Sequence, residues 1–311
     1  MKIIVQMDPI ERLNLSGDST FALLKEAQNR GYKVDFYTPD MLTLENNILY
    51  ADAYEILVST NPDEIKRKSP AKRVKLEDYD TVLMRQDPPF NMSYITATHL
   101  LETVQNKVLI INNPFYVRNC PEKIFVNKYS QFMPSTLITR NINEIKNFRD
   151  KYDKIVLKPL YGNGGANVFY SDKNDKNFQS IIEYFQNISD EQFIVQKFIP
   201  KVTFGDKRII IINGKIAGAI NRVPRDGEIR SNMHVGGQAT VTEITEYEKK
   251  ICTALSNDLI NFGLFFVGID IIDNLITEIN VTSPTGIREI YNLSGNDVSV
   301  IFWNELEMRL K

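Results

Sequence analysis

The amino-acid sequence predicts an α/β protein in which an N-terminal, open parallel-sheet lobe is followed by lobes that mix helices with antiparallel strands. Two observations predict the first lobe. Short apolar runs alternate with helical segments, and the first strand, helix and strand have the spacing of a parallel crossover unit. A third observation predicts a hairpin in the later part, because Asn213-Gly214 separates two apolar runs.

Length and composition indicate a cytoplasmic protein with more than one lobe. The chain has 311 residues, and its net charge of -2 gives no general attraction to nucleic acid or to a membrane. Cys120 and Cys252 lie far apart and outside any CxxC motif, which suits a reducing compartment. Gln6 and Asp8 interrupt the apolar core that a signal peptide needs, and the longest apolar run, around residues 263–269, is far shorter than the roughly 20 residues that span a bilayer.

The first lobe is expected to cover residues 1–120. Its strands are predicted at residues 2–7, 33–37, 81–85 and 108–111. One helix is capped by Asp18 or Ser19 and ends at Gly31, and a second lies around residues 93–104. Ligands collect at the carboxyl ends of strands in open sheets, which makes candidates of three polar residues at such ends: Asp8, Arg85 and Asp87.

A basic run lies between the second and third of these strands. Residues 64–78 carry several lysines and arginines, but acidic residues flank them and no aromatic residues are interleaved. A nucleic-acid patch is one interpretation. We expect a solvated loop instead.

The second part is expected to cover residues 121–311, after a loop-rich boundary. Its strands are predicted at residues 135–139, 154–159, 166–170, 193–198, 209–212 and 215–221. Its helices are predicted at residues 142–151, 178–186 and 247–261, with a last helix at the end of the chain. Residues 222–238 form a long polar loop of the kind that often serves as a lid.

An acidic pair with an amide lies in the segment 267–288. Asp270 is near the end of one apolar run, while Glu278 and Asn280 occupy alternate positions on the next and so share a face. Such hard oxygen donors suit Mg²⁺ that also carries phosphates. An amphipathic hairpin with its polar face in water is the alternative.

The metal hypothesis makes a geometric demand on this hairpin. A two-residue turn at Asp273-Asn274 would pair Asp270 with Thr277 and turn Glu278 to the opposite face. An odd-length loop or one bulge would place Asp270 across from Glu278. The hypothesis therefore predicts that irregularity.

A glycine-rich loop follows a strand that carries Lys158 near its end. Three glycines within four residues, Gly162, Gly164 and Gly165, would let backbone N–H groups approach phosphate oxygens. A lysine so placed can contact phosphate as a point charge, and Lys123 is a weaker candidate of the same kind. The alternative for the glycine loop is a plain hairpin turn, and the alternative for Lys158 is a charged residue at the edge of a strand.

Four arginines form a loose basic set that suits phosphate and carboxylate recognition: Arg208, Arg222, Arg225 and Arg230. Other chemistries are excluded by the motifs. The two histidines have no metal-ligand spacing, and neither a GxSxG elbow nor a cysteine nucleophile motif occurs. Covalent catalysis by the protein is not expected.

The order of these motifs resembles the ATP-grasp superfamily and, more closely, the bacterial-type glutathione synthetases. The resemblance covers essentially the whole chain. It is carried by MDPI and DPPF in the first lobe, and by NCPEK, IVLKPL, GNGGANVF, VQKFIP, GDKR and the long block FVGIDII to TSPTGIREI in the second. It implies a two-lobed ATP-grasp domain, with a nucleotide lobe at about residues 121–200 and a metal and lid lobe at about 201–311.

The resemblance also implies roles for particular residues. ATP would be bound by Lys123, Lys158, Gly162, Gly164, Gly165, Gln196, Lys197, Phe198, Ile199 and Arg208. Catalysis would depend on Arg208, Arg222 and Lys158, and Mg²⁺, with Mn²⁺ as a substitute, on Asp270, Glu278 and Asn280. The substrates would be held by Asp18, Ser19, Arg85, Arg230, Ser283, Thr285 and Arg288.

The activity implied is the ATP-dependent ligation of γ-glutamylcysteine to glycine through an acyl phosphate. The resemblance implies a homo-oligomer, a tetramer, without nucleic-acid or membrane partners. This chain departs from the family pattern at Pro121, Tyr161, Asn163 and residues 233–235. Two alternatives stay open: a related carboxylate–amine ligase with other substrates, and a nucleotide- or peptide-binding protein without catalysis.

Overall fold

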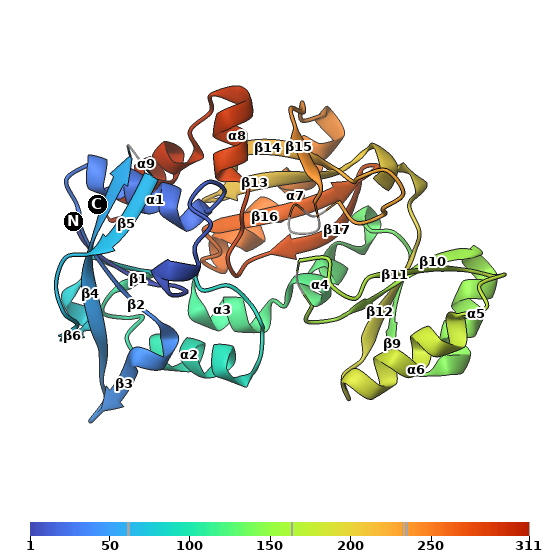
Figure 1. Cartoon of the computed structure of the whole chain (residues 1–311), viewed down its shortest axis with the longest axis horizontal. Coiled ribbons are helices and arrows are strands. Elements are labelled where there is room, and N and C mark those ends of the chain that lie inside the picture. The colour runs from blue at the N-terminus through green and yellow to red at the C-terminus, as the bar shows by residue number, and fades with distance from the viewer. Residues whose placement is uncertain (61–62, 163, 232, 234–235, 311) are drawn as a thin grey trace.

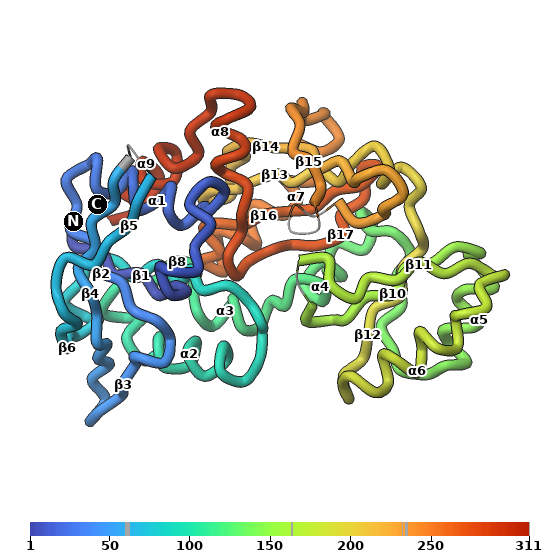
Figure 2. The backbone as a smooth tube through the Cα atoms, in the orientation of Figure 1, coloured from blue at the N-terminus to red at the C-terminus, as the bar shows by residue number. Residues whose placement is uncertain are grey.

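The computed structural model of the chain describes all residues except 61–62, 163, 232, 234–235 and 311. The described residues form three β-sheets with helices packed against them (Figure 1). The third sheet lies between the other two (Figure 2). After the first sheet the chain forms the distant second sheet, and it then returns to form the third. Among the described residues, no helix combines the length and the apolar character that crossing a membrane requires.

The first sheet has the predicted parallel centre. Strands β1 (Lys2–Gln6), β2 (Lys33–Tyr37), β7 (Thr81–Met84) and β8 (Leu109–Ile111) are parallel in the order β2-β1-β7-β8. Helices α1 (Ser19–Asn29) and α2 (Met92–Glu102) complete the crossover units. Asp18 caps α1, since its Oδ1 accepts a hydrogen bond from the Phe21 N–H at 2.6 Å.

The prediction of a solvated loop at residues 64–78 is wrong. This part contains β5 (Asp63–Arg67) and β6 (Lys72–Lys75), which pair with the long strand β4 (Ile48–Thr60), as does β3 (Leu42–Glu45). Backbone pairing to one long strand orders the segment, while its charged side chains stay near solvent. Lys66, for example, forms an exposed ion pair with Glu64 at 2.7 Å.

The second sheet has helices on one face, which leaves the other face for the cleft. Its antiparallel strands are β9 (Thr136–Thr139), β10 (Lys154–Pro159), β11 (Phe169–Asp172) and β12 (Phe193–Lys197), in the order β11-β10-β12-β9. Ile155 and Leu157 pack on α5 (Ile142–Tyr152) and α6 (Phe178–Ile188). Because side chains alternate along a strand, Val156 and Lys158 face the opposite way, into the cleft. The strand predicted at 166–170 begins three residues later, at Phe169.

The third sheet is covered on both faces. Its strands β13 (Asp206–Ile212), β14 (Lys215–Val223), β15 (Gln238–Thr240), β16 (Phe266–Ile272) and β17 (Leu275–Asn280) lie in the order β15-β14-β13-β16-β17. The Asn213-Gly214 turn joins β13 to β14 as predicted. Helix α7 (Glu246–Asn261) packs on one face, and α8 (Ile287–Ser294) and α9 (Val298–Leu310) pack on the other.

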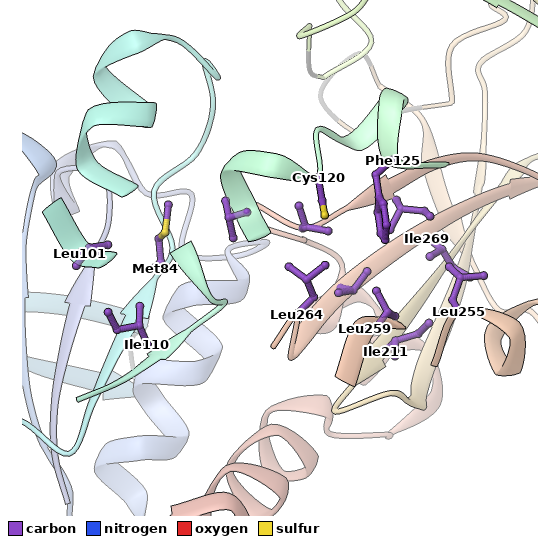
Figure 3. Packing of buried hydrophobic residues seen from close by; sticks show 14 of the residues in the cluster. Met84, Leu101, Ile110, Cys120, Phe125, Ile211, Leu255, Leu259, Leu264 and Ile269 are labelled. Carbon is purple, nitrogen blue, oxygen red and sulfur yellow. The ribbon is translucent and has the colours of Figure 1, made fainter. Parts of the chain in front are cut away.

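A continuous core crosses the boundary predicted near residue 120. One cluster of buried side chains extends from Met84 and Ile110 of the first sheet, past Phe125 of α4 (Glu122–Phe125), to Ile211 and Ile269 of the third sheet (Figure 3). Helix α3 (Pro114–Asn119) and a 3-10 helix (Val126–Phe132) flank α4.

The last helix returns to the first lobe. Trp303 of α9 is fully buried beside Phe21 and Leu23 of α1, and its indole Nε1–H donates to the Leu23 carbonyl at 2.9 Å.

Asn112 ties the first sheet to the third. Its buried amide donates to the carbonyls of Phe266 (2.8 Å) and Val281 (2.7 Å), and its Oδ1 accepts from the Phe266 N–H (2.8 Å). Three backbone groups of the third sheet therefore depend on one side chain that follows β8.

Replacing Asn112 by alanine is expected to lower the free energy of unfolding by at least about 3 kcal/mol, because each buried group left unpaired costs about 1–3 kcal/mol. Chemical denaturation measures the difference. Asn143→Ala, at an exposed helix position, is the control and should change stability by less than about 0.5 kcal/mol. Equal effects of the two changes would contradict this role for Asn112.

Candidate active site

A large cleft lies between the second and third sheets. It holds about 1380 Å³ of space, part of it open to solvent. Most of the residues selected from the sequence line it: Lys123, Lys158, Gly162, Gly164, Gly165, Gln196, Lys197, Phe198, Ile199, Arg208, Arg222, Arg230, Asp270, Glu278, Asn280, Ser283 and Thr285. Residues far apart in the sequence thus surround a single space.

The hairpin of β16 and β17 contains the irregularity that the metal hypothesis demanded. Its turn has two residues, and both Asp273 (φ 51°) and Asn274 (φ 62°) are left-handed. The register shifts between Asp270 and Ile271, and Asp270 pairs with Glu278. The predicted bulge is therefore confirmed, and the two carboxylates occupy opposite strands at the same level.

Asp270 is held by two guanidinium groups. Arg208 binds it through Nε (2.8 Å) and Nη2 (2.7 Å), and Arg222 Nη2 lies 3.0 Å away. Arg222 also pairs with Asp206 at 2.6 Å. Burial alone would raise the pKa of Asp270, but Arg208 and Arg222 outweigh it and hold this pKa well below its usual range. Burial raises the pKa of Asp206, opposed by Arg222.

Glu278 lies between the two candidate phosphate-binding lysines. Its Oε1 is 3.8 Å from Lys123 Nζ and 4.0 Å from Lys158 Nζ. Burial lowers the pKa of Lys158, although Glu278 works in the opposite direction. Acidic and basic side chains thus alternate in the cleft. If a metal ion bound the carboxylates, the lysines and arginines that now pair with them could bind an anionic ligand instead.

The oxygen donors of β16 and β17 fit a hard divalent cation. Asn280 Nδ2 lies 3.3 Å from Asp270 Oδ2, so the amide and both carboxylates are neighbours on one face of the hairpin. Two carboxylates and an amide leave coordination positions for phosphate and water, as Mg²⁺ sites commonly require. Among the described residues, no three His, Cys, Asp or Glu side chains form a metal-binding group.

The glycine loop folds against Lys123. The Lys123 ammonium donates to the Gly162 carbonyl. A Cβ on Gly162 would lie 2.4 Å from Pro159 Cγ, so the close approach requires glycine there. Gly164 and Gly165 have left-handed φ values of 65° and 76°. Asn163, a point of departure from the family pattern, lies outside the described residues.

The expected adenine segment follows β12. Gln196 is buried and donates to Thr136 Oγ1 at 3.0 Å, while Lys197 to Ile199 border the cleft before a 3-10 helix (Pro200–Phe204).

The long polar loop is shorter than the predicted residues 222–238. Arg222 belongs to β14 and Gln238 to β15, since both pair with neighbouring strands. Within the remaining loop, Arg225 donates to the Gly236 carbonyl at 2.9 Å, and Arg230 pairs with Glu228 at 2.6 Å. His234 and Val235, which depart from the family pattern, lie outside the described residues.

Four of the residues expected to hold the substrates do not line the cleft. Asp18 caps α1, and Ser19 Oγ accepts from the Gly286 N–H at 3.2 Å. Arg85 donates to Thr20 and to the Pro284 carbonyl (3.0 Å). Arg288 pairs with Asp63 at 2.7 Å. Ser19 and Arg85 thus support the backbone of the segment that carries Ser283 and Thr285.

Several residues of the cleft were not selected from the sequence, among them Glu122, Asp206 and Ser231. Asp206 stands two positions before Arg208, so strand periodicity placed both on one face and could have revealed it. Its Oδ2 accepts from Ser231 at 3.0 Å. Glu122 precedes Lys123 and accepts from Thr282 at 2.8 Å, and burial raises its pKa.

Arg222→Ala is expected to lower the free energy of unfolding at pH 7 by about 3–5 kcal/mol, because it leaves two buried carboxylates without their shared partner. Without Arg222, the folded-state pKa of Asp206 and of Asp270 rises relative to the unfolded chain. The folded state then binds protons more readily, so the deficit should shrink as the pH falls towards 5. Denaturation of variant and wild type at both pH values measures this.

Lys66→Ala is the control, since it removes a cation from the exposed pair with Glu64 and should cost less than about 1 kcal/mol. A deficit for Arg222→Ala that is small, or that grows on acidification, would contradict the role of Arg222.

Comparisons with known proteins agree along the whole chain. Residues 1–118 match the family described as prokaryotic glutathione synthetase, N-terminal domain, and residues 122–295 match the ATP-grasp domain of the same family. Glutathione synthetase of Bradyrhizobium diazoefficiens is 49% identical over 99% of this chain and 98% of its own. That of Agrobacterium fabrum is 46% identical over 99% and 96%.

Solved structures share the fold at much lower sequence identity. D-cycloserine synthetase DcsG superposes with a TM-score of 0.71 at 14% identity, covering 99% of this chain and all of that one. The macrocyclase MdnC of Microcystis aeruginosa gives 0.63 at 19% identity, covering 98% and 100%. The chain therefore belongs to the prokaryotic glutathione synthetase family and is an ATP-dependent ligase of the ATP-grasp fold.

Proposed function

We propose that this chain ligates γ-glutamylcysteine to glycine, with conversion of ATP to ADP and phosphate. One observation carries the proposal beyond family membership. Lys123, Lys158, Arg208 and Arg222 surround the same space as the donor set of Asp270, Glu278 and Asn280. Phosphoryl transfer depends on positioning and charge neutralisation, and this space supplies both.

The reaction has two steps. An oxygen of the cysteinyl carboxylate attacks the γ-phosphorus of ATP, and the bond from that phosphorus to ADP breaks. The glycine nitrogen then attacks the acyl carbon, the bond to phosphate breaks, and the amine gives up its proton as the amide forms. No covalent bond to the protein is needed, which agrees with a cleft lined by cations and carboxylates.

Each group in the cleft has a proposed task. Asp270, Glu278 and Asn280 would hold Mg²⁺, or Mn²⁺ in its place, and the bound cation would neutralise phosphate charge. Lys123 and Lys158 contact the phosphates, and the glycine loop covers them. Arg208 and Arg222, released from Asp270, stabilise the transferring phosphoryl group and the acyl phosphate.

The remaining residues bind the organic groups and exclude water. Gln196 to Ile199 hold the adenine. The substrate-holding residues proposed are Asp18, Ser19, Arg85, Arg230, Ser283, Thr285 and Arg288. The loop after Arg222 limits hydrolysis of the acyl phosphate by shutting out water.

We also propose a division of labour within the chain. Residues 1–120 serve the dipeptide, residues 121–200 the nucleotide, and residues 201–311 the metal and the lid. The protein acts in the cytoplasm as a homo-oligomer, a tetramer, without nucleic-acid or membrane partners.

The proposal is tested by ADP release from the purified protein with Mg-ATP, γ-glutamylcysteine and glycine, each omitted in turn, with the product identified by mass. ADP release that requires both substrates and yields glutathione is expected. Turnover only with a different dipeptide or amine would indicate a related ligase, and ATP binding without turnover on any substrate would indicate a non-catalytic protein.

Glu278→Gln is expected to weaken the apparent affinity for Mg²⁺ and to lower turnover at least about 100-fold, the size of a typical loss of electrostatic transition-state stabilisation. Initial rates across a Mg²⁺ titration measure both effects. Asp273→Asn, the same chemical change in the exposed turn of the same hairpin, is the control and should leave both unchanged. A near wild-type rate for Glu278→Gln would remove Glu278 from the metal site.

A further inference from the structure

Two aromatic rings join the first lobe to the glycine loop. Phe90, in the segment after β7, stacks on Tyr161, which immediately precedes Gly162. The ring centroids are 5.8 Å apart and the planes differ by 16°. An offset stack of this kind is favourable beyond the area that it buries.

The two partners are anchored differently. Phe90 packs against the buried cluster that joins the first and third sheets and touches the ring of Tyr94 in α2, with centroids 5.3 Å apart. Tyr161 is half-buried, as Phe90 is, but it is not among the described residues of the buried core of the second lobe. Phe90 is therefore packed onto the first lobe, and the ring of Tyr161 stacks on it.

The stack borders a side cavity of the cleft. This cavity holds about 330 Å³ of space, part of it open to solvent, and is lined by Pro88, Phe90, Pro121, Leu160 and Tyr161. It shares five lining residues with the main cleft: Pro88 and also Glu122, Lys123, Gly162 and Thr282. The rings thus border open space next to the phosphate-binding lysine, where ordinary core packing would leave none.

We propose that Tyr161 is a positioning residue for the nucleotide. Its ring, resting on Phe90, holds Gly162 over Lys123 and so ties the glycine loop to the first lobe. The same ring forms part of the wall of the side cavity. The inference rests on the proposed function only in naming ATP as the ligand of the loop.

Two consequences follow for the reaction. A loop without its ring must be ordered by ATP itself, so ATP binds more weakly. A side cavity without its aromatic border admits water next to Lys123, so the acyl phosphate is hydrolysed before glycine attacks. Both consequences depend on the ring of Tyr161, because the stacking contact does not involve its hydroxyl.

The test compares Tyr161→Ala, Tyr161→Phe, Phe90→Ala and the double variant Phe90→Ala/Tyr161→Ala. For Tyr161→Ala, the KM for ATP should rise about threefold to tenfold, the range to which the interaction of an aromatic pair corresponds. ADP release should also exceed peptide formation, whereas the two are equal in the wild type. Tyr161→Phe should restore both values, and the double variant should be no worse than Tyr161→Ala alone.

The matched control is Tyr184→Ala, which removes a ring from the same lobe. Tyr184 is paired with Phe169 at 5.5 Å and does not line the cleft, so its loss should leave the KM for ATP unchanged. Thermal unfolding identifies variants that do not fold, and Tyr161→Leu then replaces Tyr161→Ala.

Three results would overturn the inference: an unchanged KM and unchanged coupling in Tyr161→Ala, a defect in Tyr161→Phe as large as that in Tyr161→Ala, or additive effects of the two single changes. A wild-type protein inactive on both substrates would contradict the proposed function alone. The dissociation constant for ATP, measured by calorimetry on the same variants, then decides the role of Tyr161.

Discussion

The site depends on ion pairs between two buried arginines and two buried aspartates, which neutralise one another in the protein without a ligand. Arg222 lies between Asp206 and Asp270, and Arg208 binds the other side of Asp270. Buried carboxylates without such partners would be costly, and so would buried guanidinium groups. The strands β13, β14 and β16 must therefore lie side by side in one register, because only then do these four side chains meet.

The parts of this arrangement that follow local rules could be predicted from the sequence. Strand periodicity put Glu278 and Asn280 on one face, the two-residue turn fixed the loop length, and the need to oppose Asp270 to Glu278 required the bulge that the structure contains. The parallel centre of the first sheet and the Asn213-Gly214 hairpin followed from similar short-range patterns.

What escaped prediction depends on partners far away in the chain. The strands at residues 63–67 and 72–75 look like a charged loop until β4 supplies their pairing. The ion pair that Arg288 forms with Asp63 of the first lobe joins residues 225 positions apart, and no local pattern announces it. Ser19 and Arg85 contact the 284–287 backbone, which no local pattern reveals. Asp206 is different, because its position two residues before Arg208 on a strand could have placed it in the site from the sequence alone.

The return of α9 to α1 has a consequence for synthesis on the ribosome. The indole of Trp303 fills the core beside Leu23, a partner 280 positions earlier in the sequence. Chains are made from the N-terminus at about 5–20 residues per second, so the first lobe emerges many seconds before the helix that completes it. Throughout that interval α1 can pack on the strands of its own sheet, but the part of its apolar surface that α9 covers stays exposed.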